Sequence, residues 1–176
     1  HLSCYGLKVE EGTPLFLRQD TMHLPDDDAQ AEEYLTAVEM LADAGYRQYE
    51  ISNFARANRE SRHNLKYWTM QEYLGFGPGA HSDFAGRRFA CARDLRAYLA
   101  GEERLSESTR PARSEREEER VMLALRTVRG LDLSALSEDT AQAERVLAEC
   151  ARHGLAQREN GRWHLTPQGF LVSNAV

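Results

Sequence analysis

The chain has 176 residues, of which 41% are hydrophobic and 28% charged, as in an ordinary globular protein of one or two domains. Its net charge of −6 provides no basic surface for nucleic acid, and no apolar run is long enough to span a bilayer. The three cysteines, Cys4, Cys91 and Cys150, are too widely spaced for a disulfide framework or a short metal-binding motif. We therefore expect small core residues in a reducing, cytoplasmic compartment.

The first part of the chain has the pattern of an α/β unit. Residues 1–10 alternate as a strand does, and residues 46–55 predict a second strand. Between them, residues 24–46 predict a helix with Asp26–Asp28 at its start and Gly45 at its end. A crossover of this length implies that the two strands pair in parallel. Because two strands make no stable parallel sheet, we expect part of a larger α/β sheet or barrel, in a longer protein, with an apolar seam where the other strands belong.

The second part of the chain is mostly helical. A short helix is predicted over residues 92–102, followed by a polar, proline-containing linker over residues 104–113. The next helix, residues 114–130, begins with Ser114 as a plausible N-cap and carries three glutamates near its start. A third helix is predicted from Asp139 to His153.

The chain ends with a hairpin and a helix. Asn160-Gly161 between two short runs is a strong signal for a two-residue β-turn, and Pro167 suits the first position of a final helix. Helices followed by a hairpin resemble a winged helix, which favours DNA binding in many proteins. Acidic residues slightly outnumber basic ones from Glu102 to Val176, so we favour a docking or lid role.

The segment from Glu60 to Phe84 concentrates imidazole and aromatic groups. On a helix, His63 and Tyr67 share one face because they are four residues apart, and Asn64 and Trp68 share the next. A neutral imidazole can be an axial ligand of heme iron, and flat rings can stack on a porphyrin. On spacing alone, such a histidine is more often an ordinary structural residue that is hydrogen-bonded to its neighbours.

A glycine-rich stretch, "LGFGPGAHS", follows at residues 74–82. Its alternating glycines allow close approach of a flat or phosphate-bearing ligand, or they serve a tight turn. His81 either points into a site or bonds to a backbone carbonyl. Glu50, with Asn53, lies at a strand end, where parallel α/β folds place their sites, although a surface position for Glu50 is equally compatible with the sequence.

Four stretches together resemble the C-terminal half of the HemW-type heme chaperones of the radical S-adenosylmethionine superfamily: "YEISNFAR", "ESRHNLKYW", "YLGFGPGAHS" and "LTPQGFLVSNAV". This family is similar to oxygen-independent coproporphyrinogen III oxidase. The resemblance covers nearly the whole chain. Its most specific element is the motif His-Asn-x-x-Tyr-Trp at residues 63–68.

The resemblance implies a fold class of α/β plus small α+β. Residues 1–92 would be the last part of a partial (β/α)6 radical SAM barrel, and residues 93–176 a helical, winged-helix-like domain. The family holds a 4Fe-4S cluster in a Cys-x3-Cys-x2-Cys motif that this chain lacks. The cluster and most S-adenosylmethionine contacts would therefore belong to a missing N-terminal barrel half.

The resemblance also implies the site. His63 would bind heme iron, with Asn64, Tyr67 and Trp68 beside the heme. Ala80 and His81 would border S-adenosylmethionine by analogy with the related oxidase. No catalytic residue is predicted.

Two functions from different classes follow from the resemblance. The favoured one is a cytoplasmic heme chaperone that binds heme or a related porphyrin and delivers it to recipient apo-hemoproteins such as respiratory enzymes. The alternative is an oxidase that decarboxylates coproporphyrinogen III by a radical mechanism. An axial histidine favours the chaperone, because an iron-free substrate needs no such ligand. A third reading makes the chain scaffold only. We expect the N-terminal barrel half as a partner, no nucleic acid, and peripheral association with a membrane as compatible with the resemblance.

Overall fold

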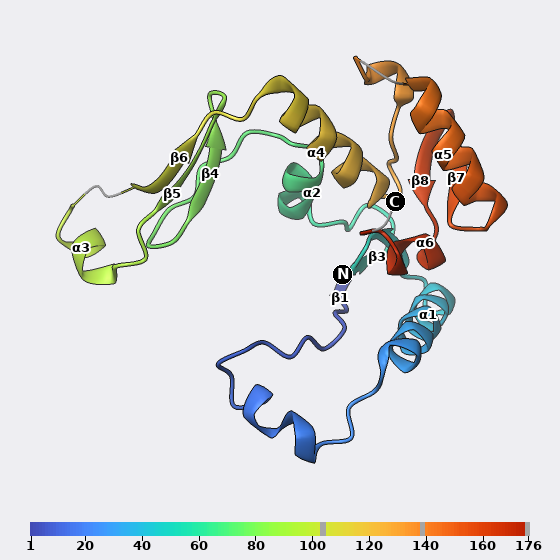
Figure 1. Cartoon of the computed structure of the whole chain (residues 1–176), viewed down its shortest axis with the longest axis horizontal. Coiled ribbons are helices and arrows are strands. Elements are labelled where there is room, and N and C mark those ends of the chain that lie inside the picture. The colour runs from blue at the N-terminus through green and yellow to red at the C-terminus, as the bar shows by residue number, and fades with distance from the viewer. Residues whose placement is uncertain (103–104, 138–139, 175–176) are drawn as a thin grey trace. The chain divides into compact units, whose positions relative to one another are not determined.

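The computed structural model describes residues 1–102, 105–137 and 140–174 (Figure 1). The chain forms two compact units. The terminal unit comprises His1–Glu60 and Leu125–Val176, and the middle unit comprises Ser61–Ala124. The predicted boundary after residue 92 falls inside the middle unit, so the assignment of residues 1–92 and 93–176 to two domains stays a prediction.

A small antiparallel sheet lies in the terminal unit. Its strands are arranged in the order β1-β3-β2, and their bounds are β1 Leu2–Ser3, β2 Arg47–Glu50 and β3 Asn53–Ala55. The predicted parallel pairing is wrong, because β3 lies between β1 and β2 and is antiparallel to both. The predicted strand 46–55 instead reverses at Ile51 and Ser52. The Glu50 carboxylate holds this turn by accepting a hydrogen bond of 2.8 Å from the Ser52 N–H.

The predicted first helix is confirmed as α1, Asp27–Asp43. The Asp26 carboxylate caps its start by accepting the Ala29 N–H at 2.9 Å. At its end the Gly45 and Tyr46 N–H groups donate back to the carbonyls of the preceding turn, with Gly45 at φ +81°. A short 3₁₀ helix, η1 (Phe16–Thr21), precedes α1.

The helix α1 packs against β2 and against the last helix of the unit. The Tyr34 hydroxyl donates to the Ile51 carbonyl and accepts from the Gln48 side chain, which fixes α1 over the turn between β2 and β3.

The C-terminal elements of the terminal unit follow the sequence signals closely. They are η2 Leu133–Ala135, α5 Thr140–Arg152, β7 Ala156–Glu159, β8 Arg162–Leu165 and α6 Pro167–Leu171. The hairpin is confirmed, with Asn160 and Gly161 at φ +49° and +80°, and so is the first helical position of Pro167, which follows the N-cap Thr166. The predicted third helix matches α5, although Asp139 lies outside the described residues.

The core of the terminal unit is built mainly from these same elements. Its buried side chains include Phe54, Leu131, Leu147, Trp163, Leu165 and Phe170.

The middle unit combines three short strands with helices. Their bounds are α2 Arg62–Trp68, β4 His81–Phe84, β5 Arg87–Cys91, α3 Leu95–Leu99, β6 Leu105–Thr109 and α4 Arg113–Leu125, whose last residue belongs to the terminal unit. The strands form one antiparallel sheet in the order β4-β5-β6, side by side in Figure 1. The prediction of a polar linker over residues 104–113 is wrong for the part that forms β6; Arg104 lies outside the described residues. The short helix predicted after Cys91 is confirmed as α3.

Two smaller predictions are corrected. The helix α4 begins at Arg113, so Ser114 is not its cap; the Glu115 carboxylate instead accepts the Ala112 N–H at 2.6 Å, and the helix ends at Leu125 rather than Gly130. The three cysteines are free and half-buried rather than core residues. Among the described residues, no helix is long and apolar enough to cross a membrane.

Candidate functional site

The predicted heme-contacting residues lie on α2. The Ser61 side chain caps this helix by accepting the Asn64 N–H at 3.3 Å, and Leu65 is buried beneath it. His63 and Tyr67 are exposed, while Asn64 and Trp68 are half-buried. The predicted shared face of His63 and Tyr67 is confirmed, because their side chains are in contact.

Three rings form what we call the imidazole–tyrosine cluster: His63, Tyr67 and Tyr73. The Nε2 of His63 and the hydroxyl of Tyr67 share a hydrogen bond of 2.9 Å, and their rings meet edge to face at 5.0 Å. Tyr67 meets Tyr73 in the same way, with ring centroids 4.7 Å apart and planes at 86°. The cluster therefore presents an imidazole to solvent on a support of perpendicular rings. Sequence reasoning missed Tyr73, because it lies beyond α2 and outside its helical spacing.

Tyr73 is fixed by its backbone. It exchanges two hydrogen bonds with Asp83 of β4, of 2.8 and 3.0 Å. Its ring is half-buried, and burial raises the pKa of its hydroxyl above the ordinary value.

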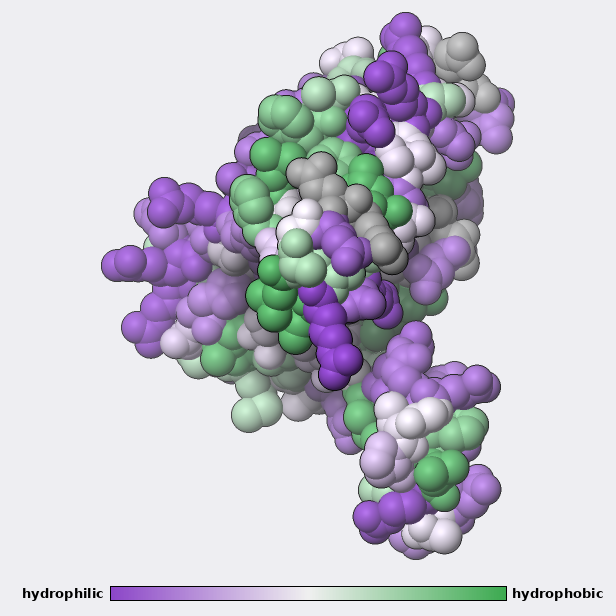
Figure 2. All heavy atoms as spheres, turned by 90° about the vertical axis from the view of Figure 1, so that its left-hand side faces the viewer, coloured by the Kyte–Doolittle hydropathy of each residue, from purple (hydrophilic) through white to green (hydrophobic). Residues whose placement is uncertain are grey.

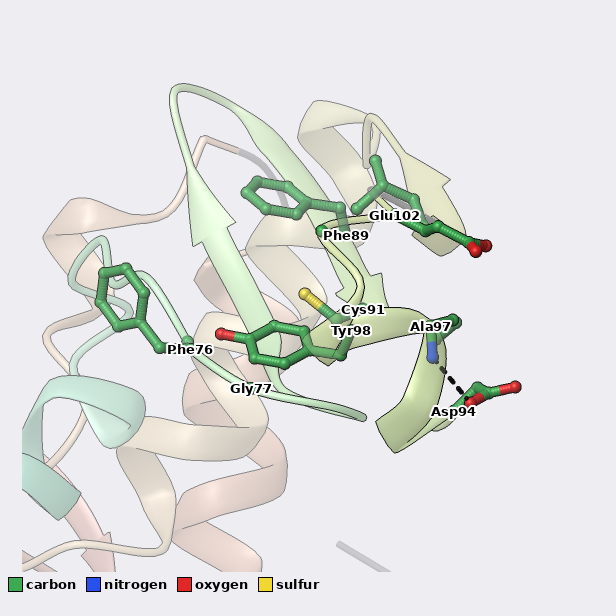
Figure 3. Close-up of a pocket in the computed structure, with 12 residues that line it drawn as sticks. Phe76, Gly77, Phe89, Cys91, Asp94, Ala97, Tyr98 and Glu102 are labelled. Carbon is green, nitrogen blue, oxygen red and sulfur yellow. Dashed lines mark hydrogen bonds between the residues drawn. The ribbon is translucent and has the colours of Figure 1, made fainter.

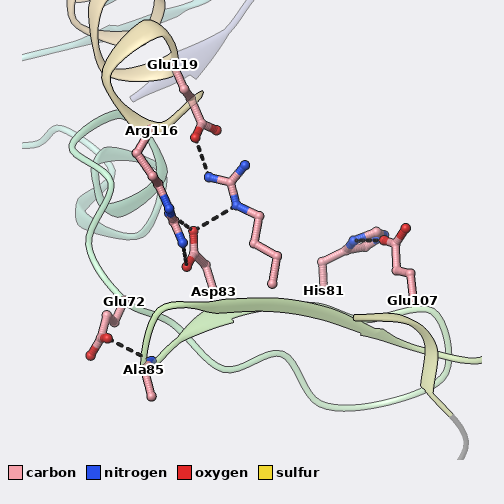
Figure 4. A network of polar contacts seen from close by, with 8 residues as sticks. Glu72, His81, Asp83, Ala85, Glu107, Arg116 and Glu119 are labelled. Carbon is pink, nitrogen blue, oxygen red and sulfur yellow. Dashed lines mark hydrogen bonds and ion pairs between the residues drawn. The ribbon is translucent and has the colours of Figure 1, made fainter. Parts of the chain in front are cut away.

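A polar network holds the Asp83 side chain in turn (Figure 4). The Arg116 guanidinium of α4 donates to both Asp83 oxygens, at 2.5 and 2.7 Å, and the Arg88 Nε donates at 3.0 Å. Arg88 also pairs with Glu119, one turn further along α4. The hydrogen bonds from Arg116, together with those from Arg88, lower the pKa of Asp83 below its ordinary value. The network ties α4 to the strands beside the cluster.

The glycine-rich stretch forms a close backbone approach. A side chain at Gly75 would place its Cβ 2.3 Å from the His81 carbonyl oxygen, and the Gly75 N–H donates to the Ser82 hydroxyl at 3.0 Å. Gly75 therefore serves the packing of its own chain. Ala80 is half-buried, and its carbonyl accepts the Cys91 N–H at 2.9 Å. His81 is exposed and lies 3.3 Å from the Glu107 carboxylate, so its partner is on β6 rather than on α2 (Figure 4).

An open, mainly apolar pocket lies elsewhere in the middle unit, between this stretch, β5, β6 and α3. Its volume is about 660 Å³. Figure 3 shows the rings of Phe76, Phe89 and Tyr98 and the sulfur of Cys91 around it. Phe76 is 85% exposed, which is unusual for so large an apolar side chain. The pocket is lined by enough apolar surface to hold an apolar molecule.

Hydrophobic side chains also gather near this pocket. Figure 2 faces the α3 end of the chain and shows green hydrophobic groups among purple polar ones. The exposed apolar side chains of α3 and its neighbours are Phe76, Leu95, Tyr98, Leu99 and Leu105.

Glu50 is not a surface residue. It is 1% exposed, and its carboxylate is bonded to the Ser52 N–H and to the Asn53 side chain. The Asn53 side-chain amide oxygen accepts a hydrogen bond from the Ser3 hydroxyl at 2.5 Å. These contacts hold the β1-β3-β2 sheet together, so Glu50 has a structural role in the terminal unit.

The described residues contain no group of three or more histidine, cysteine, aspartate or glutamate side chains arranged to hold a metal ion. A heme iron needs only one or two protein ligands, so a single exposed imidazole remains a suitable donor.

The sequence of this chain is similar to those of known proteins along its whole length. The heme chaperone HemW of Bacillus subtilis is 33% identical over 190 residues, which cover 100% of this chain and 49% of that protein. The chain resembles the C-terminal half of a HemW-type heme chaperone. The predicted resemblance to HemW is thus confirmed, and the chain spans about half the length of the curated relatives that match it throughout.

Further comparisons agree with the HemW resemblance. The HemN C-terminal domain family matches residues 112–172. Radical S-adenosyl methionine domain-containing protein 1, mitochondrial, of Mus musculus is 52% identical over 86 residues, 48% of this chain and 20% of that protein. The solved structure of Escherichia coli coproporphyrinogen III oxidase (HemN), a radical SAM enzyme, has a TM-score of 0.64 at 18% identity, covering 91% of this chain and 43% of HemN. This likeness and the mixed helix and strand content agree with the C-terminal part of such a fold.

Proposed function

We propose that the protein containing this chain is a heme chaperone that binds heme through His63 and delivers it to recipient apo-hemoproteins. The observation that carries the proposal is the exposed imidazole of the His-Asn-x-x-Tyr-Trp motif, set beside Tyr67 in a chain that resembles HemW. The donor fits the cargo: imidazole is a common axial ligand of heme iron, and its exposure leaves room for a flat macrocycle. Asn64 and Trp68 would lie along the same edge of the bound heme.

The rest of the protein completes this proposal. Residues 1–92 would be the last part of a (β/α)6 barrel whose N-terminal half carries the 4Fe-4S cluster and most contacts to S-adenosylmethionine, and Ala80 and His81 would border that molecule. Residues 93–176 would form the winged-helix-like domain. We expect a cytoplasmic protein that associates peripherally with membranes where its recipients are, and that binds no nucleic acid.

Hemin titration of the full-length protein tests the role of His63. We expect His63→Ala to abolish the defined Soret band of the complex and to weaken hemin binding by at least tenfold, because the iron loses its protein ligand. The matched control is His153→Ala, since His153, directly after α5, is also exposed and contacts a residue four positions away, Glu149 of that helix. An unchanged spectrum in His63→Ala would remove His63 from the assignment.

The apolar pocket provides a second comparison. If the macrocycle lies against Phe76 and Tyr98, Phe76→Ala will weaken hemin binding while His63→Ala does not. We expect the reverse. Turnover of coproporphyrinogen III by the full-length protein, with S-adenosylmethionine and a reductant, would contradict the chaperone assignment and favour the oxidase.

A further inference from the structure

The structure distinguishes the two nitrogens of the His63 ring. Nε2 is hydrogen-bonded to the Tyr67 hydroxyl at 2.9 Å. Among the described residues, no side chain or backbone group is hydrogen-bonded to Nδ1. In metal sites, a ligating histidine almost always donates its other ring N–H to a neighbouring acceptor, which fixes the tautomer and the ring orientation. The Tyr67 hydroxyl oxygen is such an acceptor.

The position of Tyr67 is itself determined by a chain of contacts. Its ring meets the Tyr73 ring at 4.7 Å and 86°. Tyr73 is paired through its backbone with Asp83, which is 9% exposed and holds the guanidinium of Arg116. An exposed tyrosine would ordinarily sample several rotamers. Here its ring lies against Tyr73, whose backbone is paired with Asp83, and Arg116 holds the Asp83 carboxylate.

We propose that heme iron is bound by Nδ1 of His63 while Nε2–H keeps its hydrogen bond to Tyr67, and that Tyr73 is the positioning residue that holds Tyr67. The proposal rests on the proposed function, which supplies the heme. In the opposite arrangement, Nε2 would bind the iron and Tyr67 would compete with it. The two arrangements predict opposite effects of removing one hydroxyl group.

Tyr67→Phe in the full-length protein therefore decides between them. It keeps the ring and its contact with Tyr73 but removes the acceptor. We expect the Kd for hemin to rise about tenfold, the lower end of the effect of losing a hydrogen-bond partner of a metal ligand. We also expect a broadened Soret band as the imidazole loses its fixed orientation. Tighter binding, or an unchanged Kd and spectrum, would overturn the proposal.

Two variants of Tyr73 test its positioning role. Tyr73→Leu removes the ring beneath Tyr67 and should reproduce the weaker binding and broadened band of Tyr67→Phe. Tyr73→Phe keeps the ring and should retain most of the wild-type affinity and band shape. Wild-type spectra in Tyr73→Leu would show that Tyr73 does not position Tyr67. Circular dichroism of each variant separates this effect from unfolding, and Tyr67→Phe, which alters only an exposed hydroxyl, does not depend on that control.

His63→Ala in the same titration distinguishes failure of the Nδ1 assignment from failure of the heme site itself. Loss of the spectrum in His63→Ala with no effect of Tyr67→Phe overturns the assignment of Nδ1 and leaves the heme site intact. No effect of His63→Ala overturns the heme site at His63 and the present proposal with it.

Discussion

The carboxylate of Asp83 accepts hydrogen bonds from two arginines and is nearly excluded from solvent. Charge-assisted bonds of this kind, with two parallel N–H groups from Arg116, are strong and directional. Removing the carboxylate charge leaves the part-buried guanidinium of Arg116 without this partner, which costs stability. Asp83 therefore contributes to stability as well as to the support of Tyr73.

We expect Asp83→Asn to lower the free energy of unfolding by about 2 kcal/mol near neutral pH, the size of hydrogen bonds to a charged group in a part-buried position. Because the pKa of Asp83 is below its ordinary 3.8 in the folded protein, the wild-type advantage is complete above that value and is lost as pH falls through the folded pKa. Urea unfolding at several pH values measures this effect. The difference in free energy of unfolding between wild type and Asp83→Asn should be constant from about pH 5 to 8 and should decrease below about pH 4.

A matched control is Asp43→Asn, which changes an exposed aspartate on α1. Its effect should stay within about 0.5 kcal/mol at every pH. Equal effects of the two substitutions would contradict a special role for the pairing with Arg116 and Arg88.

At the residue scale, sequence spacing predicted the contact of His63 with Tyr67, because a helix of known period fixes which side chains meet. It could not predict Tyr73, whose place depends on backbone pairing with Asp83 in a strand that was itself not predicted. It also left Glu50 open, because its partners Ser52 and Asn53 face the carboxylate only when the chain reverses after Glu50, and that reversal was not predicted.

The short helix α6 packs so closely that one position admits only glycine. A Cβ at Gly169 would lie 1.9 Å from the Leu155 carbonyl oxygen and 3.1 Å from the Leu165 side chain. The carbonyl that would be struck also accepts the Thr166 N–H, so it cannot move away without breaking the junction between β8 and α6.

We expect Gly169→Ala to destabilise the terminal unit by about 3 kcal/mol, as overpacking does in a dense core, despite the better helix propensity of alanine. Thermal unfolding should then shift down by roughly 10 °C. The control is Gly6→Ala, where the nearest atom to the added Cβ is a side-chain oxygen at 3.7 Å and little change is expected. A melting temperature of Gly169→Ala equal to that of the control would contradict the close approach.

At the element scale, the correct predictions were those with strong local signals: α1 with its caps, the Asn160-Gly161 hairpin, and α6 with Thr166 and Pro167. The incorrect predictions concerned strands that are defined by backbone pairing with other strands rather than by a pattern in their own sequence. All five side chains of β6 are exposed, so the strand shows no apolar alternation, and its register with β5 is fixed by backbone bonds. The turn between β2 and β3 contains no glycine, proline or asparagine, so the sequence resembles one continuous strand.

At the scale of the whole molecule, the imidazole–tyrosine cluster and its supporting network come from one stretch of chain, Ser61–Ala124. The terminal unit contributes none of these side chains. Heme binding at His63 should therefore slow hydrogen exchange in the middle unit and leave exchange in the terminal unit unchanged.

Hydrogen exchange of the full-length protein with and without hemin tests this expectation. Bound heme should slow exchange in peptides that cover α2 and residues 73–84, because ordering of the cluster suppresses local opening. Peptides of α5 and β7 provide the internal control and should be unchanged. Protection concentrated in peptides from Phe76 and from α3 instead would place the porphyrin in the apolar pocket.

The exposure of the His63 ring has a consequence for how cargo would leave. A carrier that binds a flat molecule through one exposed side chain leaves most of the edge of that molecule exposed to solvent. An acceptor protein could then bind the exposed edge before the carrier dissociates, so that the molecule is transferred without entering bulk water. The rate of this direct transfer would increase with acceptor concentration. Release from a closed cavity would instead be limited by the rate at which the cavity opens.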